Sequence, residues 1–426
     1  MVRKLTAVAL STLMITTSLP AEETERLEII GADILNPETG RVLTGQRILI
    51  EHGRISVIES ASGRRQDAST TRLDLTGLTI LPGLIDLHSH LLLHPYDETS
   101  WNDQVLKESL ELRTIRGVIA AQRTLEAGFT TLRDLGTEGA AYADVALRDA
   151  INLGIIPGPR VFAATRAIVA TGCYGPSGFD PRWDLPKGAQ VADGPVEVRK
   201  VVRQQIAAGA DWIKVYADYR RKPGDPSTPT FSQAELDAIV DEATSAGLPV
   251  AAHASTDEAI RRAVLAGVKT IEHGYQASEE VLTLMRDHGV VLCPTLTASE
   301  SMARYSGWDE TQKDHPRITG AKALMKRALK VGVIIACGSD VGVFSHGDNA
   351  RELELLAAYG MKTEEVIRSA TTIAARTLGK ENELGRIAQG YLADLIAVKG
   401  NPLRDITVLR SPVVVIKDGI VVIDRR

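Results

Sequence analysis

The sequence has little of three features that mark particular classes of protein. Aromatic residues make up only 4% of the 426 residues, so a core must be built from Ala, Val, Leu and Ile, which suits an α/β protein with buried parallel strands. The net charge is -5 and no basic run is present, so nothing favours binding to nucleic acid. The three cysteines, Cys173, Cys293 and Cys337, form no CxxC pair, which argues against a disulfide framework and against a thiolate metal site.

Long hydrophobic runs are also missing, and the first apolar stretch is too short and too rich in Ser and Thr for a membrane span. This stretch, Leu5–Leu19, follows the basic residues Arg3 and Lys4 and precedes a small residue, Ala21, which is the pattern of a secretion signal. We therefore expect residues 1–21 to be a signal peptide and the mature protein to be periplasmic or secreted. A frayed N-terminal strand or helix is the alternative.

The two ends of the chain share a β-rich texture. Short runs rich in Ile and Val alternate with turn signals such as Asn36-Pro37 and His52-Gly53 near the N-terminus. Near the C-terminus, Asp418-Gly419 is typical of a β-hairpin. We predict that residues 22–81 and 379–426 together form one small β-sandwich domain.

The middle of the chain, residues 82–378, alternates short apolar runs with helical stretches, as βα units do. One helix begins at a capping box of Ser232 and Glu235 and ends at Gly247. Eight apolar runs with helices between them predict an α/β fold of the (β/α)8 TIM-barrel type. The runs are Leu84–His90, Thr130–Asp134, Arg160–Ala164, Trp212–Tyr216, Pro249–His253, Thr270–His273, Val290–Pro294 and Ile334–Asp340.

Polar residues lie at the C-terminal ends of these runs, where barrel enzymes carry their chemistry. The first run ends in His88-Ser89-His90, and residues two apart on a strand face the same way, so both imidazoles face the barrel mouth. Each polar residue alone has a structural explanation, such as capping a helix, but six at five strand ends favour a metal site. The other four are Lys214, His253, His273 and Asp340.

This pattern resembles the amidohydrolase superfamily, binuclear type, over nearly the whole chain. The motif Leu81–Asp86 adds to the resemblance, and Ser345–Leu353 is similar to the strand-eight loop of the prolidase-like and Xaa-Arg carboxypeptidase-like branch. Bacterial members that hydrolyse ochratoxin A are similar as well. One segment departs from the pattern: Thr171–Gly175 stands where relatives commonly carry a His in a Gly-rich turn, which leaves the strand-three contribution to substrate binding open.

The resemblance implies two divalent metal ions and a metal-bridging Lys214. It also implies a homo-oligomer, for which an octamer is one candidate. The bridge would be N6-carboxylysine, formed when a desolvated lysine amine captures CO2. Nitrogen and oxygen ligands without thiolates make Zn²⁺ the expected metal. The ligands would be His88, His90 and Asp340 for one ion and His253 and His273 for the other.

The expected chemistry assigns two catalytic residues. Water between two metals becomes hydroxide near neutral pH and attacks an amide carbonyl, and Asp340 is placed to take its proton and pass it to the leaving amine. Tyr216, two residues after Lys214 on the same side of strand four, is the candidate donor to the oxyanion, with a packed aromatic role as the alternative. Weaker candidates for substrate contact are His346, for which a solvated loop position is the alternative, Arg166, for which a cap or loop salt bridge is, and Tyr174.

Three functions fit these residues. We favour a carboxypeptidase-like amide hydrolase whose substrates are N-acyl or aminoacyl amino acids with a hydrophobic or aromatic C-terminal residue. The resemblance adds ochratoxin A, cleaved to ochratoxin alpha and phenylalanine, so the expected partner is a small-molecule amide or dipeptide. A cyclic-amide hydrolase would share the full ligand set, whereas a deaminase would use one metal and typically lack Lys214. A non-catalytic metal-binding barrel is the third hypothesis, and the complete ligand set argues against it.

Overall fold

The computed structural model describes residues 26–60, 70–180, 182–222 and 224–426. The predicted signal peptide, residues 1–21, lies outside the described residues. Within the described ranges, every helix is too short or too polar to cross a lipid bilayer.

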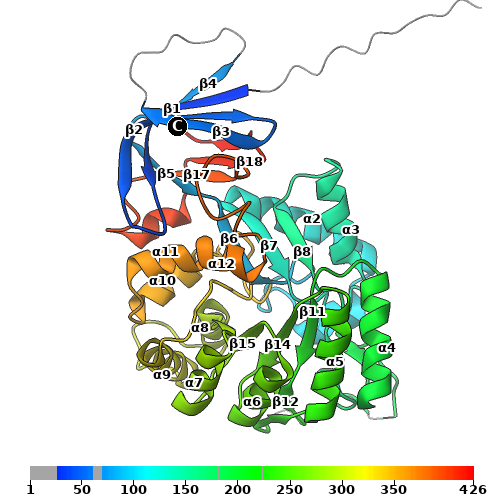
Figure 1. Cartoon of the computed structure of the whole chain (residues 1–426). Helices are drawn as coiled ribbons and strands as arrows, with labels where there is room; N and C mark the ends of the chain where they lie inside the picture. The colour runs from blue at the N-terminus through cyan, green and yellow to red at the C-terminus, as the bar shows by residue number, and fades with distance from the viewer. Residues whose placement is uncertain (1–25, 61–69, 181, 223) are drawn as a thin grey trace, which may run out of the picture.

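Both ends of the chain meet in one eight-stranded sheet, drawn at the top of Figure 1. Its order is β19-β18-β17-β5-β1-β2-β3, and β4 pairs with β1. The antiparallel pairing of β5 with β17 joins the N-terminal strands to the C-terminal ones. The strands are β1 (Arg26–Leu35), β2 (Val42–Glu51), β3 (Arg54–Ser60), β4 (Thr71–Asp74), β5 (Leu78–Pro82), β17 (Leu395–Lys399), β18 (Val414–Lys417) and β19 (Ile420–Asp424).

This sheet has a hydrophobic core of its own. Ile29, Ile48 and Ile80 are fully buried in it beside Leu395 and Val414, so residues from the two ends of the chain share one core. The hairpin predicted at Asp418-Gly419 is confirmed: β18 pairs with β19, and both turn residues have the positive φ that a tight two-residue hairpin requires. The pairing of the two chain ends is thus built from strands that the sequence marks by their Ile and Val runs.

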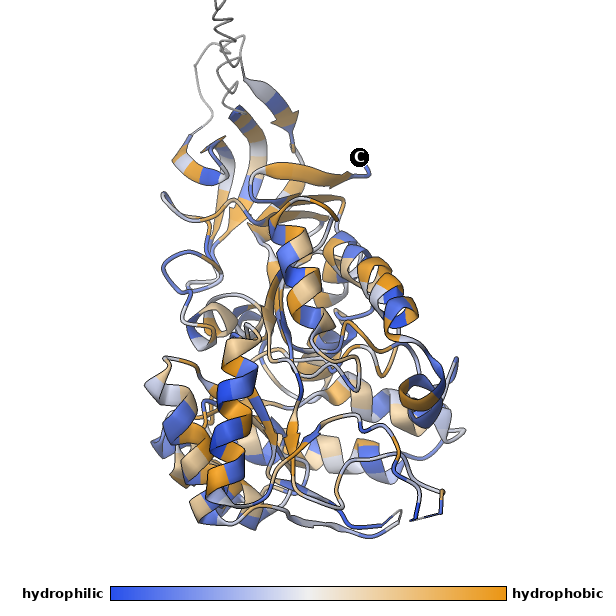
Figure 2. Ribbon diagram, turned by 90° about the vertical axis from the view of Figure 1, so that its right-hand side faces the viewer, coloured by the Kyte–Doolittle hydropathy of each residue, from blue (hydrophilic) through white to orange (hydrophobic). Residues whose placement is uncertain are grey.

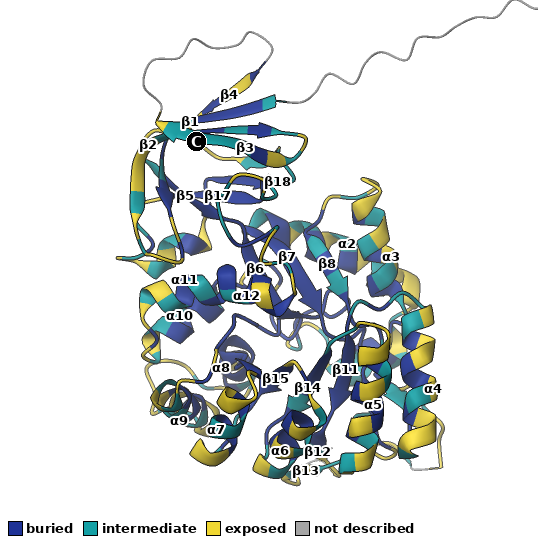
Figure 3. Cartoon of the chain, in the orientation of Figure 1, coloured by how far each residue is buried: buried dark blue, intermediate teal, exposed yellow. Residues whose placement is uncertain are grey.

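Parallel strands form the interior of the larger part of the molecule. They make a three-stranded sheet, β6-β7-β8, and a six-stranded sheet, β10-β9-β11-β14-β15-β16. Most of them are buried along their whole length (Figure 3), which explains why their sequences are continuous apolar runs. The strands are β6 (Leu84–Ser89), β7 (Phe129–Asp134), β8 (Arg160–Ala163), β9 (Ile168–Val169), β10 (Gln190–Val191), β11 (Ile213–Tyr216), β14 (Val250–Ala254), β15 (Thr270–His273) and β16 (Val291–Cys293).

Seven of the eight predicted runs are strands, and the eighth differs. The segment makes isolated bridges instead, through Ile335 to β16 and through Val341, the residue after the predicted run, to β6. Between these bridges the backbone N–H of Ser339 donates to the buried carboxylate of Asp86 at 2.9 Å. A side chain thus takes the place of the backbone carbonyl that a neighbouring strand would offer. On the opposite side, the N–H of Asp211 donates to the carbonyl of Ala163 at 2.7 Å and connects β8 with the segment that leads into β11.

Helices surround these strands and carry apolar stripes beside polar ones (Figure 2). The predicted capping box is confirmed: Ser232 and Glu235 bond reciprocally at the start of α5, and Gly247 follows its end with φ of 76°. The alternation of parallel strands and helices is a TIM-barrel-type α/β fold. The helices are α1 (Trp101–Lys107), α2 (Leu110–Glu126), α3 (Ala143–Asn152), α4 (Gly194–Ala207), α5 (Gln233–Ser245), α6 (Asp257–Ala266), α7 (Glu279–Asp287), α8 (Leu296–Tyr305), α9 (Pro316–Val331), α10 (Arg351–Ala358), α11 (Thr363–Ser369), α12 (Thr372–Thr377) and the 3-10 helix η1 (Ile406–Arg410).

Candidate metal centre

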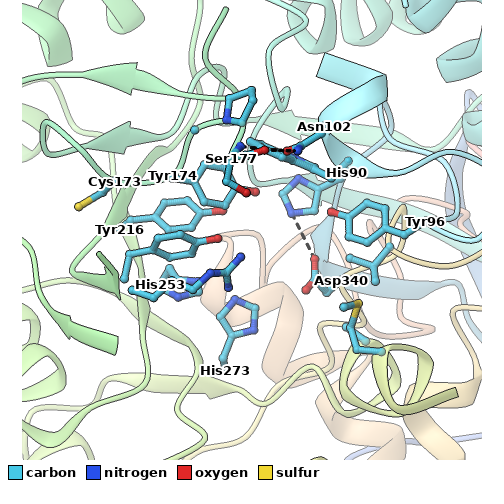
Figure 4. Close-up of a pocket in the computed structure, with 18 of the residues that line it drawn as sticks. His90, Tyr96, Asn102, Cys173, Tyr174, Ser177, Tyr216, His253, His273 and Asp340 are labelled. Carbon is cyan, nitrogen blue, oxygen red and sulfur yellow. Dashed lines mark hydrogen bonds and ion pairs between the residues drawn. The ribbon is translucent and has the colours of Figure 1, made fainter. Parts of the chain in front are cut away.

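A cavity of about 690 Å³ opens at the C-terminal ends of the parallel strands. Its base is formed by imidazoles and one carboxylate, and tyrosines form one wall (Figure 4). The predicted site residues that line it are His88, His90, Tyr174, Tyr216, His253, His273 and Asp340.

One group at the base consists of His88, His90 and Asp340, whose ligand atoms all lie within 4.8 Å of one another. Oδ1 of Asp340 is 3.2 Å from Nε2 of His90 and 3.6 Å from Nε2 of His88. The other ring nitrogens are held elsewhere: Nδ1 of His88 lies 2.8 Å from Oε2 of Glu272, and Nδ1 of His90 lies 2.8 Å from the carbonyl oxygen of Gly136. Each ring is thereby oriented with Nε2 toward Asp340, as outer partners orient the imidazoles of metal sites.

A second group pairs His253 with His273, whose ring centroids are 4.5 Å apart. Nδ1 of His273 contacts Oγ1 of Thr295 at 2.7 Å, and Nε2 of His253 lies 3.7 Å from Oδ1 of Asp218. The ring of His273 is also 5.1 Å from that of His88, which makes the two groups neighbours. His88, His90 and His273 therefore each keep Nδ1 within hydrogen-bond distance of a protein partner, whereas the contact of His253 with Asp218 is longer.

Lys214 is fully buried on β11, and its Nζ has no hydrogen-bond partner among the described residues. Burial lowers its pKa, and the attraction of Glu272 and Asp340 offsets this only in part. The charge of Lys214 in turn lowers the pKa of His88, His253 and His273. A buried amine without a partner costs free energy, and it requires an explanation in the chemistry of the site.

Electrostatics keep most of the imidazoles in the form that binds metals. Burial, reinforced by Lys214, places the pKa of His88 well below its usual value and lowers that of His253 to about 3, so both rings are neutral. His90 differs: burial acts to lower its pKa, but the hydrogen bond to Asp340 and the charge of Glu138 raise it to about 9. A cation bound by His90 and Asp340 would replace the proton that this pair shares.

The donor set fits a pair of divalent ions. It offers imidazole nitrogens, a carboxylate and one unpartnered amine at two adjacent positions, and the described lining places no thiolate at either group, because Cys173 contacts Arg221 instead. Nitrogen and oxygen donors in this combination suit Zn²⁺ and similar ions.

Two buried carboxylates brace this centre, and the sequence reading did not assign them to the site. Glu272 bonds His88 through Oε2 and receives a hydrogen bond from Arg133 at 2.9 Å through Oε1. Asp86 accepts hydrogen bonds from the backbone N–H of His88 at 3.0 Å and from Asn349 at 2.8 Å. The signal for both is an acidic residue inside an apolar strand, where an unpaired charge is costly.

The strand-eight loop supports His273 from a distance. Glu352, at the start of α10, accepts hydrogen bonds from the backbone N–H groups of Leu296 and Thr297 at the start of α8. Burial raises the pKa of Glu352 to about 8. Because Thr295 immediately precedes α8 and contacts His273, this carboxyl group fixes the residue that orients a ligand.

Backbone conformation at the site is unusual. Nine non-glycine residues of the described chain have positive φ, and five of them border the centre: Glu138, Tyr174, His273, Thr295 and Asp340. Left-handed backbone costs free energy for such residues and concentrates where function requires a fixed geometry. Two of the predicted metal ligands are held in this way.

One wall of the cavity is aromatic. Tyr216 stacks on His253 with centroids 4.5 Å apart, and Tyr174 lies 4.4 Å from Tyr216. The hydroxyl of Tyr174 donates to buried Glu138, which also accepts a hydrogen bond from Trp101 at 2.8 Å. Sequence reasoning missed Glu138, because nothing in a loop sequence reveals that its carboxylate fixes two rings.

Two weaker candidates lie outside this cavity, so their positions do not support the predicted substrate contact. Nε2 of buried His346 contacts the carbonyl oxygen of Leu93 at 3.1 Å, and burial lowers the pKa of His346 to about 4. Arg166 reaches the carbonyl oxygen of Ala189 at 3.4 Å. Both side chains contact backbone carbonyl oxygens instead.

The chain is similar to several known proteins over nearly its whole length. Ochratoxinase from Aspergillus niger is 32% identical over 421 residues, which cover 91% of this chain and 84% of that protein. A crystal structure of a Xaa-Pro dipeptidase with bound methionine superposes with a TM-score of 0.83 at 35% identity, covering 93% of this chain and 99% of that one. The crystal structure of a prolidase complexed with N-methylphosphonate-L-proline superposes with a TM-score of 0.82 at 31% identity, covering 94% of this chain and 100% of that one.

The model of the amidohydrolase family matches residues 79–422, which include every predicted metal ligand. Together with the identity to ochratoxinase across nearly the whole chain, this match establishes the protein as a member of the amidohydrolase family, a hydrolase that acts on amide bonds.

Proposed function

We propose that this protein is a two-metal amide hydrolase of carboxypeptidase-like specificity, with zinc as the resident metal. The observation that carries the proposal is the buried, unpartnered amine of Lys214 beside two groups of oriented imidazoles. A neutral amine there can add CO2 and lose one proton, which gives an N6-carboxylysine that would add an anionic oxygen donor to the ligand set. His88, His90 and Asp340 would hold one ion, and His253 and His273 the other.

The chain's own residues account for the remaining steps. When bound, a pair of dications supplies a hydroxide at neutral pH and polarises the scissile carbonyl. Asp340 accepts the proton of the attacking water and delivers it to the leaving nitrogen, because its carboxylate lies at the base of the cavity and its lowered pKa keeps it ionised before the reaction. Burial acts to raise that pKa, but His88 and His90 outweigh it. The Tyr216 hydroxyl donates to the oxyanion from the adjacent wall.

The substrate is an N-acyl or aminoacyl amino acid with a hydrophobic or aromatic C-terminal residue, and ochratoxin A is one such amide. Five of the nine tyrosines of the chain line the cavity, although aromatic residues are scarce overall. They offer rings for stacking against an apolar side chain. The names of the ochratoxinase and dipeptidase relatives support the same class of substrate.

The proposal extends to architecture and location. We propose that the two parallel sheets close into a (β/α)8 barrel spanning residues 82–378, and that residues 22–81 and 379–426 form the β-sandwich domain. The hydrogen bonds and bridges between the sheets support closure. Export directed by residues 1–21 and assembly into a homo-oligomer complete the proposal.

Metal content and product release test the function together. The purified protein is analysed for zinc and other metals, and is then incubated with N-acetyl-L-phenylalanine, dipeptides and ochratoxin A while free amino acid is measured. We expect about two ions per chain and release of phenylalanine that a chelator abolishes. One ion per chain would favour a deaminase-type site, and two ions with cleavage of cyclic amides alone would favour the cyclic-amide alternative. Absence of both metal and turnover would leave a non-catalytic barrel.

A further inference from the structure

Positive charge is concentrated at the entrance to the cavity. Five cationic side chains line it, and Asp340 is the only carboxylate among the described residues that do so. None of the five forms an ion pair with a carboxylate within the described ranges, and all five are exposed. We call this set the cationic rim, and it consists of Lys187, Arg220, Arg221, Lys222 and Arg317.

The cationic rim contrasts with the net charge of the whole chain, which is -5. Three of its members lie on one short hairpin, in which β12 (Asp218–Arg220) pairs with β13 (Ser227–Pro229) directly after β11. The others approach from the loop before β10 and from the first turn of α9. Cations that converge from three directions without carboxylate partners form a field that attracts an anionic ligand.

Within the rim, Arg220 is the best placed to bind such a ligand directly. Its guanidinium carbon lies 4.9 Å from the ring centroid of Tyr219, and the described residues provide it with no hydrogen-bond acceptor. Arg221, in contrast, already contacts the sulfur of Cys173 and the carbonyl oxygen of Pro229. Stacking on Tyr219 orients the planar guanidinium, so its N–H groups can pair with a carboxylate at little further entropic cost.

Arg220 is also linked to the metal centre. The ring of Tyr219 lies 6.1 Å from that of His253 and 5.1 Å from that of Tyr174. A substrate whose carboxylate is bound at Arg220 would therefore extend along the aromatic wall toward the centre.

We infer that this enzyme requires a free carboxylate on its substrate and that Arg220 is the specificity-determining residue that binds it. The remaining members of the cationic rim steer the anion toward the cavity. The inference rests on the proposed function, and it excludes neutral cyclic amides and nucleobase-like amines as preferred substrates.

The test compares N-acetyl-L-phenylalanine with its C-terminal carboxamide, which has the same shape without the charge. We expect the metal-loaded wild-type protein to prefer the carboxylate by about 100-fold in kcat/KM, the scale of a charge-assisted pair. Arg220→Gln should remove most of that preference, mainly by raising KM, because the contact exists in both the ground and transition states. Arg220→Lys should restore part of it.

Two control variants make the assignment specific. Arg203→Gln removes an exposed arginine of α4 that is paired with Glu242 and is not part of the cavity lining, and it should leave both substrates unaffected. Arg317→Gln removes another rim cation and should change the carboxylate preference less than Arg220→Gln does. A larger effect of Arg317→Gln, or equal cleavage of both substrates by the wild type, would overturn the inference.

The role of Arg220 can be tested even if the proposed reaction is wrong. If the wild type cleaves neither compound, calorimetric titration of the zinc-loaded protein with the same two compounds still decides the matter. Tighter binding of the carboxylate that is lost in Arg220→Gln supports the inference even if the reaction class is wrong. Equal binding of the two compounds, or binding of the carboxylate that is unchanged in Arg220→Gln, contradicts it.

Discussion

The base of the cavity and its entrance are built on different physical principles. The base consists of buried strand-end residues, each held by a second protein group: His88 by Glu272, His90 by Gly136 and His273 by Thr295. The cationic rim consists of exposed side chains on a hairpin, a loop and a helix start, without carboxylate partners in the described chain. The side chains at the base are therefore held in fixed positions, whereas those at the entrance can adapt to a ligand.

This contrast follows from what each region must do. Reacting groups need positions fixed to a fraction of an ångström, which packed strands and outer hydrogen bonds can provide. Capture of a charged substrate needs field strength and reach, which long solvated side chains provide without fixed geometry. A substitution at the base should therefore affect turnover strongly, and one at the entrance should affect mainly KM.

Among substitutions at the base of the cavity, Lys214→Ala should have the largest effect. If this amine forms the proposed bridge, its removal should cause loss of at least one metal ion and a fall in turnover of ~10⁴-fold or more. Elemental analysis and amino-acid release on the same preparation measure both effects.

The control for this prediction is Lys214→Met, which fills the same buried volume without a charge. Because the buried amine has no partner, the metal-free Met variant should melt no lower than the metal-free wild type. Full metal occupancy with normal turnover in either variant would refute the bridging role of Lys214.

Asp340→Asn should have the next largest effect. The amide keeps the shape and an oxygen donor but cannot accept and return a proton, so turnover should fall by roughly 10²- to 10⁴-fold. The fold should persist, because the backbone N–H of this residue still donates to the carbonyl oxygen of His88 at 2.7 Å. Circular dichroism, metal content and kcat are compared with those of the wild type, and a near-normal kcat would remove Asp340 from the proton transfer.

The base could be predicted from the sequence because strand periodicity and the rule for barrel strand ends act locally. Lys214, His253 and His273 each end or occupy a short apolar run, and those runs are strands in the structure. Even where the eighth run proved to be two isolated bridges, Asp340 still reached the centre, because Asp86 fixes the neighbouring Ser339.

The entrance could not be predicted in the same way. Loop residues carry no periodicity that shows which way they face, so His346 and Arg166 were selected although neither lines the cavity. Two orienting carboxylates were missed for a related reason, Glu138 in a loop and Glu272 on a strand of the base: their role lies in contacts with residues distant along the chain. A single sequence shows which residues end the strands, but it does not show which side chains orient them.

Tyr216 lies where the two regions meet, and it should give the smallest of these effects. Tyr216→Phe keeps the stacking on His253 and the packing against Tyr174 while removing one hydroxyl group. If that hydroxyl donates to the oxyanion, kcat should fall by about 100-fold with little change in KM, because the contact forms only in the transition state. Thermal melting should shift little, and Tyr174→Phe, which removes the hydroxyl that donates to Glu138, is the matched control. An unchanged kcat for Tyr216→Phe would assign Tyr216 to the aromatic wall alone. Lys214 would then be the only residue of β11 with a role in the reaction.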